Sequence, residues 1–155
     1  GDAQREYAEA DRDGDGLIEY AQRFRSTQGK RDGLFWPTVE NEPLSPLGPL
    51  AAQVKVEGYA AKDAKPIPLH GYYYRILTSQ GKDAPGGAYD YMVNGNMIGG
   101  YALVAYPARW GASGVMSFIC NHDGAVYQKN LGEKSADIAT KMKQFNPDAS
   151  WQKTE

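Results

Sequence analysis

The sequence predicts an α+β domain: an N-terminal helix, an irregular Pro-rich loop, an antiparallel β-sheet meander and a short C-terminal helix. Three observations lead to this fold class. The 155 residues include 18 Gly and 9 Pro, an excess that argues against a simple helix bundle. The second half carries β-branched and aromatic runs bounded by Gly, Pro or Asn, which is typical of strands. Helix-favouring composition occurs near the two ends.

The first fifty residues predict two short helices and a loop. Residues 2–10 read as the end of a helix, which the Asp- and Gly-rich stretch 11–16 must break, and residues 19–25 as a second helical turn. Residues 29–50 contain four prolines, so they cannot form regular structure. Because they also carry Trp36 and several leucines, we expect a loop packed against the body of the domain.

Four strands are predicted between the loop and the final helix: residues 72–78, 101–106, 115–120 and 125–129. The sequence Asn-His-Asp-Gly at residues 121–124 is a strong hairpin signal, because Gly124 supplies a positive φ after Asp123. The last three strands should therefore form an antiparallel meander.

A final helix is predicted over residues 136–145. Ser135 is placed to cap it, and Ile138, Met142 and Phe145 fall on one apolar stripe. Asn146 and Pro147 should end it.

Composition and charge exclude several classes of protein. The net charge of −2 gives no electrostatic surface for nucleic acid. No apolar run reaches 18 residues, so no membrane-spanning helix is expected in this chain. Cys120 is the sole cysteine, which excludes an internal disulfide and favours a small buried apolar residue. We expect residues 1–155 to form a single domain, the C-terminal part of a longer protein.

The strongest local motif is an acidic loop that follows the calcium-loop pattern. Its predicted ligands are Asp11, Asp13, Asp15, the Leu17 carbonyl, Glu19 and Gln22, with Gly16 at the sharp turn and Ile18 as the core anchor. Calcium sensors have a bidentate Glu where this loop has Gln22. The loss of that carboxylate predicts a weak Ca²⁺ site, with a dissociation constant of about 10⁻⁴–10⁻³ M. The alternative is a polar turn between two helices.

A second group of candidate residues is aromatic. The charge-poor surface predicted around the sheet favours ligand binding by Tyr72, Tyr74, Trp110, His70 and His122, because aromatic rings with a polar tip suit binding faces. Ordinary sheet packing is the alternative.

No catalytic constellation is present, and we expect no enzymatic activity. His122 and Asp123 are adjacent in a tight turn, so they are better read as hairpin residues than as an acid–base pair. A hydrolase that uses His70, His122 and Asp123 is kept as an alternative.

Several strings identify a family resemblance: GLFWP at 33–37, HGYYYRIL at 70–77, APGGAYDYMV at 84–93, GGYALVAYPARWGASGVMSF at 99–118 and NHDGAVYQKNLG at 121–132. They resemble the bacterial family catalogued as domain of unknown function 2950, over nearly the whole chain. The resemblance implies a periplasmic or otherwise exported protein of a diderm bacterium, and it brings no established activity. The order of elements is also loosely similar to pilin-like and pseudopilin-like globular domains, which implies a pilin-like architecture.

The favoured hypothesis is a non-enzymatic exported domain that binds a partner or supports an envelope assembly, with calcium stabilising the acidic loop. A glycan- or peptide-binding module that uses the surface tyrosines is the first alternative, and the envelope hydrolase is the second. The expected partner is an envelope protein or a glycan.

Overall fold

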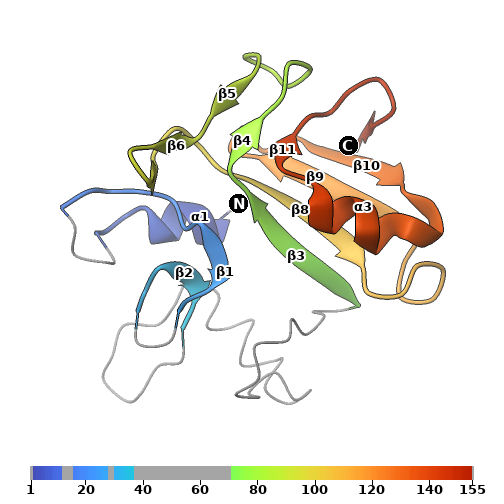
Figure 1. Ribbon diagram of the computed structural model, residues 1–155, viewed down its shortest axis with the longest axis horizontal. Coiled ribbons are helices and arrows are strands. Elements are labelled where there is room, and N and C mark those ends of the chain that lie inside the picture. Colours follow the sequence, from blue (N-terminus) through green and yellow to red (C-terminus); the bar gives the residue numbers. More distant parts are fainter. Residues whose placement is uncertain (1, 12–15, 28–29, 37–70, 155) are drawn as a thin grey trace. The chain divides into compact units, whose positions relative to one another are not determined.

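A computed structural model describes residues 2–11, 16–27, 30–36 and 71–154 (Figure 1). The chain divides into two compact units, Gly1–Ile67 and Pro68–Glu155. Most of the predicted Pro-rich loop lies outside the described residues, from residue 37 onward. The single domain therefore stays a prediction.

The first unit contains helix α1 (Asp2–Tyr7) and a parallel pair of strands, β1 (Arg23–Arg25) and β2 (Gly33–Phe35). Gln4 of α1 is buried, and its carboxamide both accepts from the backbone N–H of Ala21 and donates to the Ala21 carbonyl, each at 2.8 Å. This double hydrogen bond ties the backbone of Ala21 to the helix.

The helical turn expected over residues 19–25 is wrong. Residues 17–21 have no regular structure, and Arg23–Arg25 is a strand paired with β2. Local composition favoured a helix, but pairing with β2 holds residues 23–25 extended, and the two hydrogen bonds from Gln4 fix the backbone just before them at Ala21. Tertiary contacts therefore override propensity. Helix α1 also stops at Tyr7, three residues short of the expected end.

The second unit is built on a five-stranded antiparallel sheet with the order β12–β10–β9–β8–β3. Its strands, in chain order, are β3 (Tyr72–Leu77), β8 (Ala102–Pro107), β9 (Met116–Asn121), β10 (Val126–Asn130) and β12 (Gln152–Lys153). The first four are the predicted strands, and each of their ends lies within one residue of the predicted position. The expected meander of β8, β9 and β10 is confirmed.

The β9–β10 hairpin turns as the sequence predicts. Gly124 has φ +88°, and its backbone N–H donates to the Asn121 carbonyl at 3.0 Å. Cys120 and Val126 are the last facing pair before the turn.

One face of this sheet forms the core of the unit. Val104 and Ile119 face each other across β8 and β9 and are 0% and 1% exposed. Helix α3 (Ser135–Lys141) lies across this face in Figure 1 and contacts β8 with its buried residue Ala139. A short 3-10 turn, η1 (Gly132–Lys134), leads into α3.

The helix predicted over residues 136–145 is only partly correct. It ends at Lys141, Met142 has an extended backbone, and Phe145 belongs to a strand, β11 (Gln144–Phe145). Ser135 lies inside the helix, where its hydroxyl donates to the Gly132 carbonyl, so it does not act as the expected cap. Ile138 is exposed, and the stripe is replaced by Ala139 facing the sheet.

Strand pairing explains the early end of α3. Strand β11 runs parallel to β4 (Ser79–Gln80), which also pairs with β5 (Tyr89–Asp90). Phe145 is 0% exposed, and its ring packs edge-on against Tyr127 with 5.9 Å between the ring centres.

A separate hairpin joins β6 (Met92–Val93) to β7 (Asn96–Met97).

Candidate functional site

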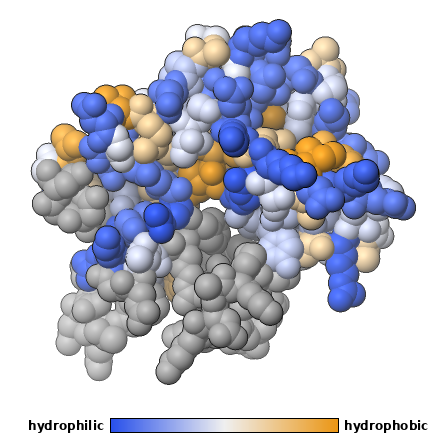
Figure 2. All heavy atoms as spheres, in the orientation of Figure 1, coloured by the Kyte–Doolittle hydropathy of each residue, from blue (hydrophilic) through white to orange (hydrophobic). Residues whose placement is uncertain are grey.

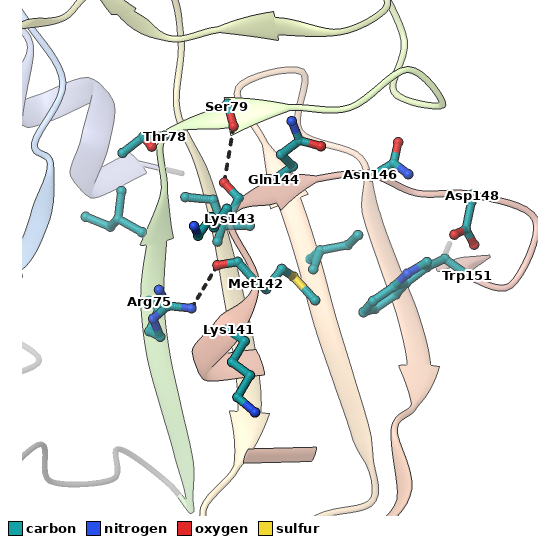
Figure 3. A pocket seen from close by; sticks show the side chains of 13 residues that line it. Arg75, Thr78, Ser79, Lys141, Met142, Lys143, Gln144, Asn146, Asp148 and Trp151 are labelled. Carbon is teal, nitrogen blue, oxygen red and sulfur yellow. Dashed lines mark hydrogen bonds between the residues drawn. The ribbon is translucent and has the colours of Figure 1, made fainter. Parts of the chain in front are cut away.

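The second unit has an open groove of about 810 Å³ beside α3. It lies where β3 continues into β4, under the segment that leaves α3, and extends to the C-terminal residues before β12. Figure 3 shows the side chains that line it, which come from these elements. Hydrophilic side chains cover most of this part of the surface in Figure 2, with a smaller apolar patch between them.

The groove has an apolar floor and a polar rim. Leu77 and Ile119, each 1% exposed, form part of the floor because the alternation of β3 and β9 turns them toward α3. The rim includes Lys141, Lys143 and Gln144, all exposed. A volume of this size is within the usual range of about 300–1,000 Å³ for ligand pockets.

Arg75 fixes the wall of the groove on the α3 side. Its guanidinium donates to the Ala139 carbonyl and, at 3.0 Å, to the Met142 carbonyl. The last carbonyls of a helix have no partner within it and carry partial negative charge. The Arg75 side chain therefore satisfies the end of α3 and holds the turn that places Lys141 and Lys143 on the rim.

The segment after α3 is held on its other side as well. The Ser79 hydroxyl donates to the Lys143 carbonyl at 3.2 Å. Asn146 accepts from the backbone N–H of Asp83 at 2.9 Å and donates to its carboxylate at 3.1 Å. With β4–β11 pairing, these bonds make the groove a preformed feature.

Trp151 is positioned by a tight turn at Asp148. The Asp148 carboxylate accepts from the backbone N–H of Ser150 at 2.8 Å and from its hydroxyl, and the backbone N–H of Trp151 donates to the Asp148 carbonyl at 3.0 Å. The Ser150 hydrogen bonds lower the pKa of the Asp148 carboxyl, so it is ionised at neutral pH. The Lys129 ammonium lies 5.9 Å from the centre of the Trp151 ring.

Several rim groups have no partner among the residues that the structure describes. These are the ammonium groups of Lys141 and Lys143, the Gln144 carboxamide and the Trp151 indole N–H. Polar groups that the fold leaves unpaired at a preformed groove are suited to noncovalent binding.

A second polar cluster surrounds His122. Its Nδ1 accepts from the backbone N–H of Tyr101 at 3.4 Å, so Nε2 carries the ring proton of the neutral imidazole and donates to the Tyr89 hydroxyl at 3.1 Å. The rings of Tyr89, Tyr91 and Tyr101 lie 5.6–6.4 Å from the imidazole. The Asp123 carboxylate is 3.9 Å from Nε2, beyond hydrogen-bond reach.

Gln80 is the buried centre beside that cluster. Its side-chain nitrogen donates to the carbonyls of Pro85 and Gly87 at 2.9 and 2.7 Å. Its oxygen accepts from the Tyr91 hydroxyl at 2.8 Å and from the Asn121 amide at 3.3 Å. Burial raises the pKa of Tyr91 to about 12. Because the polar atoms of the Gln80 side chain all have hydrogen-bond partners within the protein, we read this network as part of the folded core and not as a binding site.

The other predicted aromatic site residues within the described ranges are Tyr72, Tyr74 and Trp110. None of the contacts that the structure describes for them is with His122. The Tyr72 hydroxyl donates to the Met116 carbonyl at 3.0 Å, and its ring is 6.0 Å from Phe118. Trp110 is 37% exposed, and its indole N–H donates to Asn130 at 2.9 Å. Tyr74 is half-buried on β3. Ligand binding by these side chains stays a prediction.

His70 lies outside the described residues, so its distance from His122 is not defined. The hydrolase alternative gains no support from Asp123, since that carboxylate does not hydrogen-bond His122.

The acidic loop is described at its two ends. The Asp11 carboxylate accepts from the backbone N–H of Gly16 at 2.8 Å, and Gly16 has φ +88°, as the sharp turn requires. Asp13 and Asp15 lie outside the described residues. Leu17, Glu19 and Gln22 follow the turn in irregular backbone, and no group of three or more His, Cys, Asp or Glu residues placed to hold a metal occurs in the described ranges.

Ile18 is 54% exposed, so its expected role as the core anchor of the loop is wrong. The helix that would follow the loop, and would turn this residue inward, is absent from the described residues 16–25.

The groove residues Lys141, Lys143, Gln144 and Trp151 were not predicted as a site. The sequence assigned the first three to a helix, on which they would not converge with Trp151. A signal was nevertheless present, because cations at 141 and 143 are spaced as neighbours on one side of an extended chain.

The fold and groove define a small protein of mostly β-sheet with few short helices. The family described as "Protein of unknown function (DUF2950)" matches residues 1–154, and the chain belongs to that family. No curated protein and no solved structure matches the chain. No helix in the described ranges is long and apolar enough to cross a membrane.

Proposed function

We propose that this protein is a non-enzymatic binding domain of the bacterial cell envelope and that the groove beside α3 is its ligand site. The observation that carries the proposal is the contrast between fixed walls and unpaired rim groups. Arg75, Ser79 and Asn146 hold the backbone around the groove, while Lys141 and Lys143 have no ion-pair partner in the described structure.

A site that is shaped before the ligand arrives binds more tightly, because ordering it on binding costs affinity. The groove meets this condition, and Trp151 adds a large flat ring whose position is set by the Asp148 turn. Aromatic side chains contribute large contact areas at low entropic cost, which makes Trp151 the expected anchor.

Two candidate ligand sites remain: the groove, and the tyrosine face, by which we mean the predicted binding surface of Tyr72, Tyr74 and Trp110. They are separated by titrating ¹⁵N-labelled protein with soluble cell-wall oligosaccharides and with wall-derived peptides, and following backbone amide shifts. Binding in the groove should move the signals of Lys143, Gln144 and Trp151. Trp151→Ala should abolish binding, and Trp110→Ala should leave it unchanged.

The opposite result would assign binding to the tyrosine face. If Trp110→Ala or Tyr72→Phe removes binding and Trp151→Ala does not, the groove proposal is wrong. The alternative of a glycan- or peptide-binding module that uses the surface tyrosines would then be favoured.

We also propose a weak calcium site at the acidic loop, supported by the Asp11–Gly16 hydrogen bond and the left-handed backbone at Gly16. With a dissociation constant of 10⁻⁴–10⁻³ M, about 10 mM Ca²⁺ should stabilise chelator-stripped protein by about 1.4–2.7 kcal/mol. Thermal melts should show this rise, and Asp11→Asn should reduce it, whereas Asp2→Asn on α1 should not. An unchanged melting temperature at that concentration would remove calcium from the proposal.

Export and the pilin-like architecture also stay proposals, and both rest on resemblance. Fractionation of cells that express the full-length natural protein should recover it outside the cytoplasm. Recovery in the cytoplasmic fraction alone would contradict the envelope role.

A further inference from the structure

We propose that the ligand of the groove is a negatively charged glycan, one whose sugar rings carry carboxylates. The inference rests on the proposed binding function and adds the chemistry of the ligand. Its basis is the balance of charges and hydrogen-bonding groups that the fold leaves unpaired along the rim.

The charges of the groove are unbalanced. Its lining includes three cations, Arg75, Lys141 and Lys143, and among the described lining residues one carboxylate, Asp148. The Asp148 carboxylate is engaged with Ser150 and the Arg75 guanidinium with the end of α3, so the unpaired charges on the rim are those of the two lysines. The whole chain has a net charge of −2, so the cationic groove is a local arrangement. Cations gathered at a concave site attract anions and select against cations.

The hydrogen-bonding groups point the same way. Each lysine ammonium has donors and no acceptor, and so does the Trp151 indole N–H. Among the unpaired rim groups within the described ranges, Gln144 and the Thr78 hydroxyl can also accept. A ligand that satisfies this rim must therefore supply mainly acceptors; carboxylates only accept, and ring hydroxyls can accept as well as donate.

The shape of the site favours a glycan over an acidic peptide. A peptide that adds to a sheet edge needs a run of free backbone N–H and C=O groups. Strand β11 has two residues, it is paired with β4, and its Phe145 carbonyl accepts from Gly81 at 2.9 Å. The groove instead offers the Trp151 ring, against whose apolar surface the C–H face of a sugar can pack.

The test is a titration of the protein with three probes, in which calorimetry measures binding at low and at moderate salt. The first is an oligogalacturonate, the second is a neutral galactose oligomer of the same length, and the third is an oligoglutamate peptide. The oligogalacturonate should bind most tightly, and added salt should weaken it, since surface charges are screened. Amide shifts should map its binding to Lys143, Gln144 and Trp151.

Two double variants complete the test. Lys141→Gln with Lys143→Gln removes the groove charges and should weaken oligogalacturonate binding about tenfold or more, which corresponds to about 1.4 kcal/mol. Lys30→Gln with Lys134→Gln removes the same charge at exposed positions outside the groove lining and should have no such effect. Unchanged melting temperatures would show that both variants are folded.

The outcomes separate the inference from the function beneath it. If the neutral oligomer binds in the groove as tightly as the acidic one, the charge inference is wrong and the binding function stands. Tighter binding of oligoglutamate overturns the glycan assignment. If none of the probes binds, the acidic-glycan inference is wrong. If the probes bind only at the tyrosine face, both the inference and the proposed binding function of the groove are wrong.

Discussion

Two polar regions of the second unit lie on either side of a single short strand. Strand β4 places Ser79 on the groove, while its neighbour Gln80 points into the buried network with Tyr91 and Asn121. This follows from the two-residue period of a strand. In the Gln80 network every polar atom of the central side chain is bound within the protein, whereas the rim of the groove keeps unpaired donors.

The contrast separates stability from binding. A buried polar group whose partner is removed loses hydrogen bonds that water cannot replace. An exposed group on a rim remains solvated, so its removal changes what the surface can bind and leaves the folded state nearly as stable. Substitutions in the two regions should therefore have opposite consequences.

The largest effect is expected for Gln80→Met, which keeps the length of the side chain and removes its polar atoms. The carbonyls of Pro85 and Gly87 and the Tyr91 hydroxyl would lose their partner inside the protein. We expect a loss of about 3–5 kcal/mol in the free energy of unfolding, since the buried Tyr91 hydroxyl and Asn121 amide are left unsatisfied at about 1–3 kcal/mol each and the two part-buried carbonyls lose a hydrogen bond. Urea unfolding followed by circular dichroism measures it.

The matched control is Gln144→Met on the rim. It makes the same chemical change at an exposed side chain that has no hydrogen bond in the described structure. Its free energy of unfolding should stay within about 0.5 kcal/mol of the parent. Equal losses in the two variants would show that the distinction between a closed network and an open rim is wrong.

An effect of intermediate size on the free energy of unfolding is expected from a change of pH, because Tyr91 ionises. Its pKa is about 12 in the folded protein, chiefly because burial disfavours the phenolate, and about 10 when unfolded. A raised folded pKa means that the stabilising contribution is complete below pH 10 and is lost as pH rises from 10 to 12. The loss is at most about 2.7 kcal/mol, from two pKa units.

Comparison with Tyr91→Phe isolates this residue from the other tyrosines, because Tyr74, Tyr89 and Tyr106 also have raised pKa values. The variant lacks the ionisable hydroxyl, so the stability difference between parent and variant should shrink as pH rises above 10. Parallel stability curves for the two proteins over that range would contradict the buried position of the Tyr91 hydroxyl.

The sheet could be predicted from the sequence, and the groove could not. Strands β3, β8, β9 and β10 are marked by local signals: β-branched and aromatic runs, and a turn that needs Gly124. The groove depends on where α3 stops, and that is decided by contacts distant in sequence. Arg75 reaches the end of the helix 64 residues later, and β11 pairs with β4.

The same reason explains the errors in the first unit. A segment of helical composition becomes β1 because β2 and Gln4 hold it, and no local signal reports either contact. The acidic loop was easier to detect, since Asp11 and Gly16 meet within five residues. Local motifs can be recognised from sequence, whereas sites assembled from separate elements require the fold.

The smallest effect on stability is expected for Lys141→Ala combined with Lys143→Ala. Both side chains are exposed and have no ion-pair partner among the described residues, so their removal breaks no internal contact. The loss of two like charges close together should leave the free energy of unfolding within about 0.5 kcal/mol of the parent, measured by the same urea titration. A loss as large as that of Gln80→Met would mean that the lysines support the fold. The rim would then have to be read as part of the structural core, and its unpaired donors would no longer argue for a ligand.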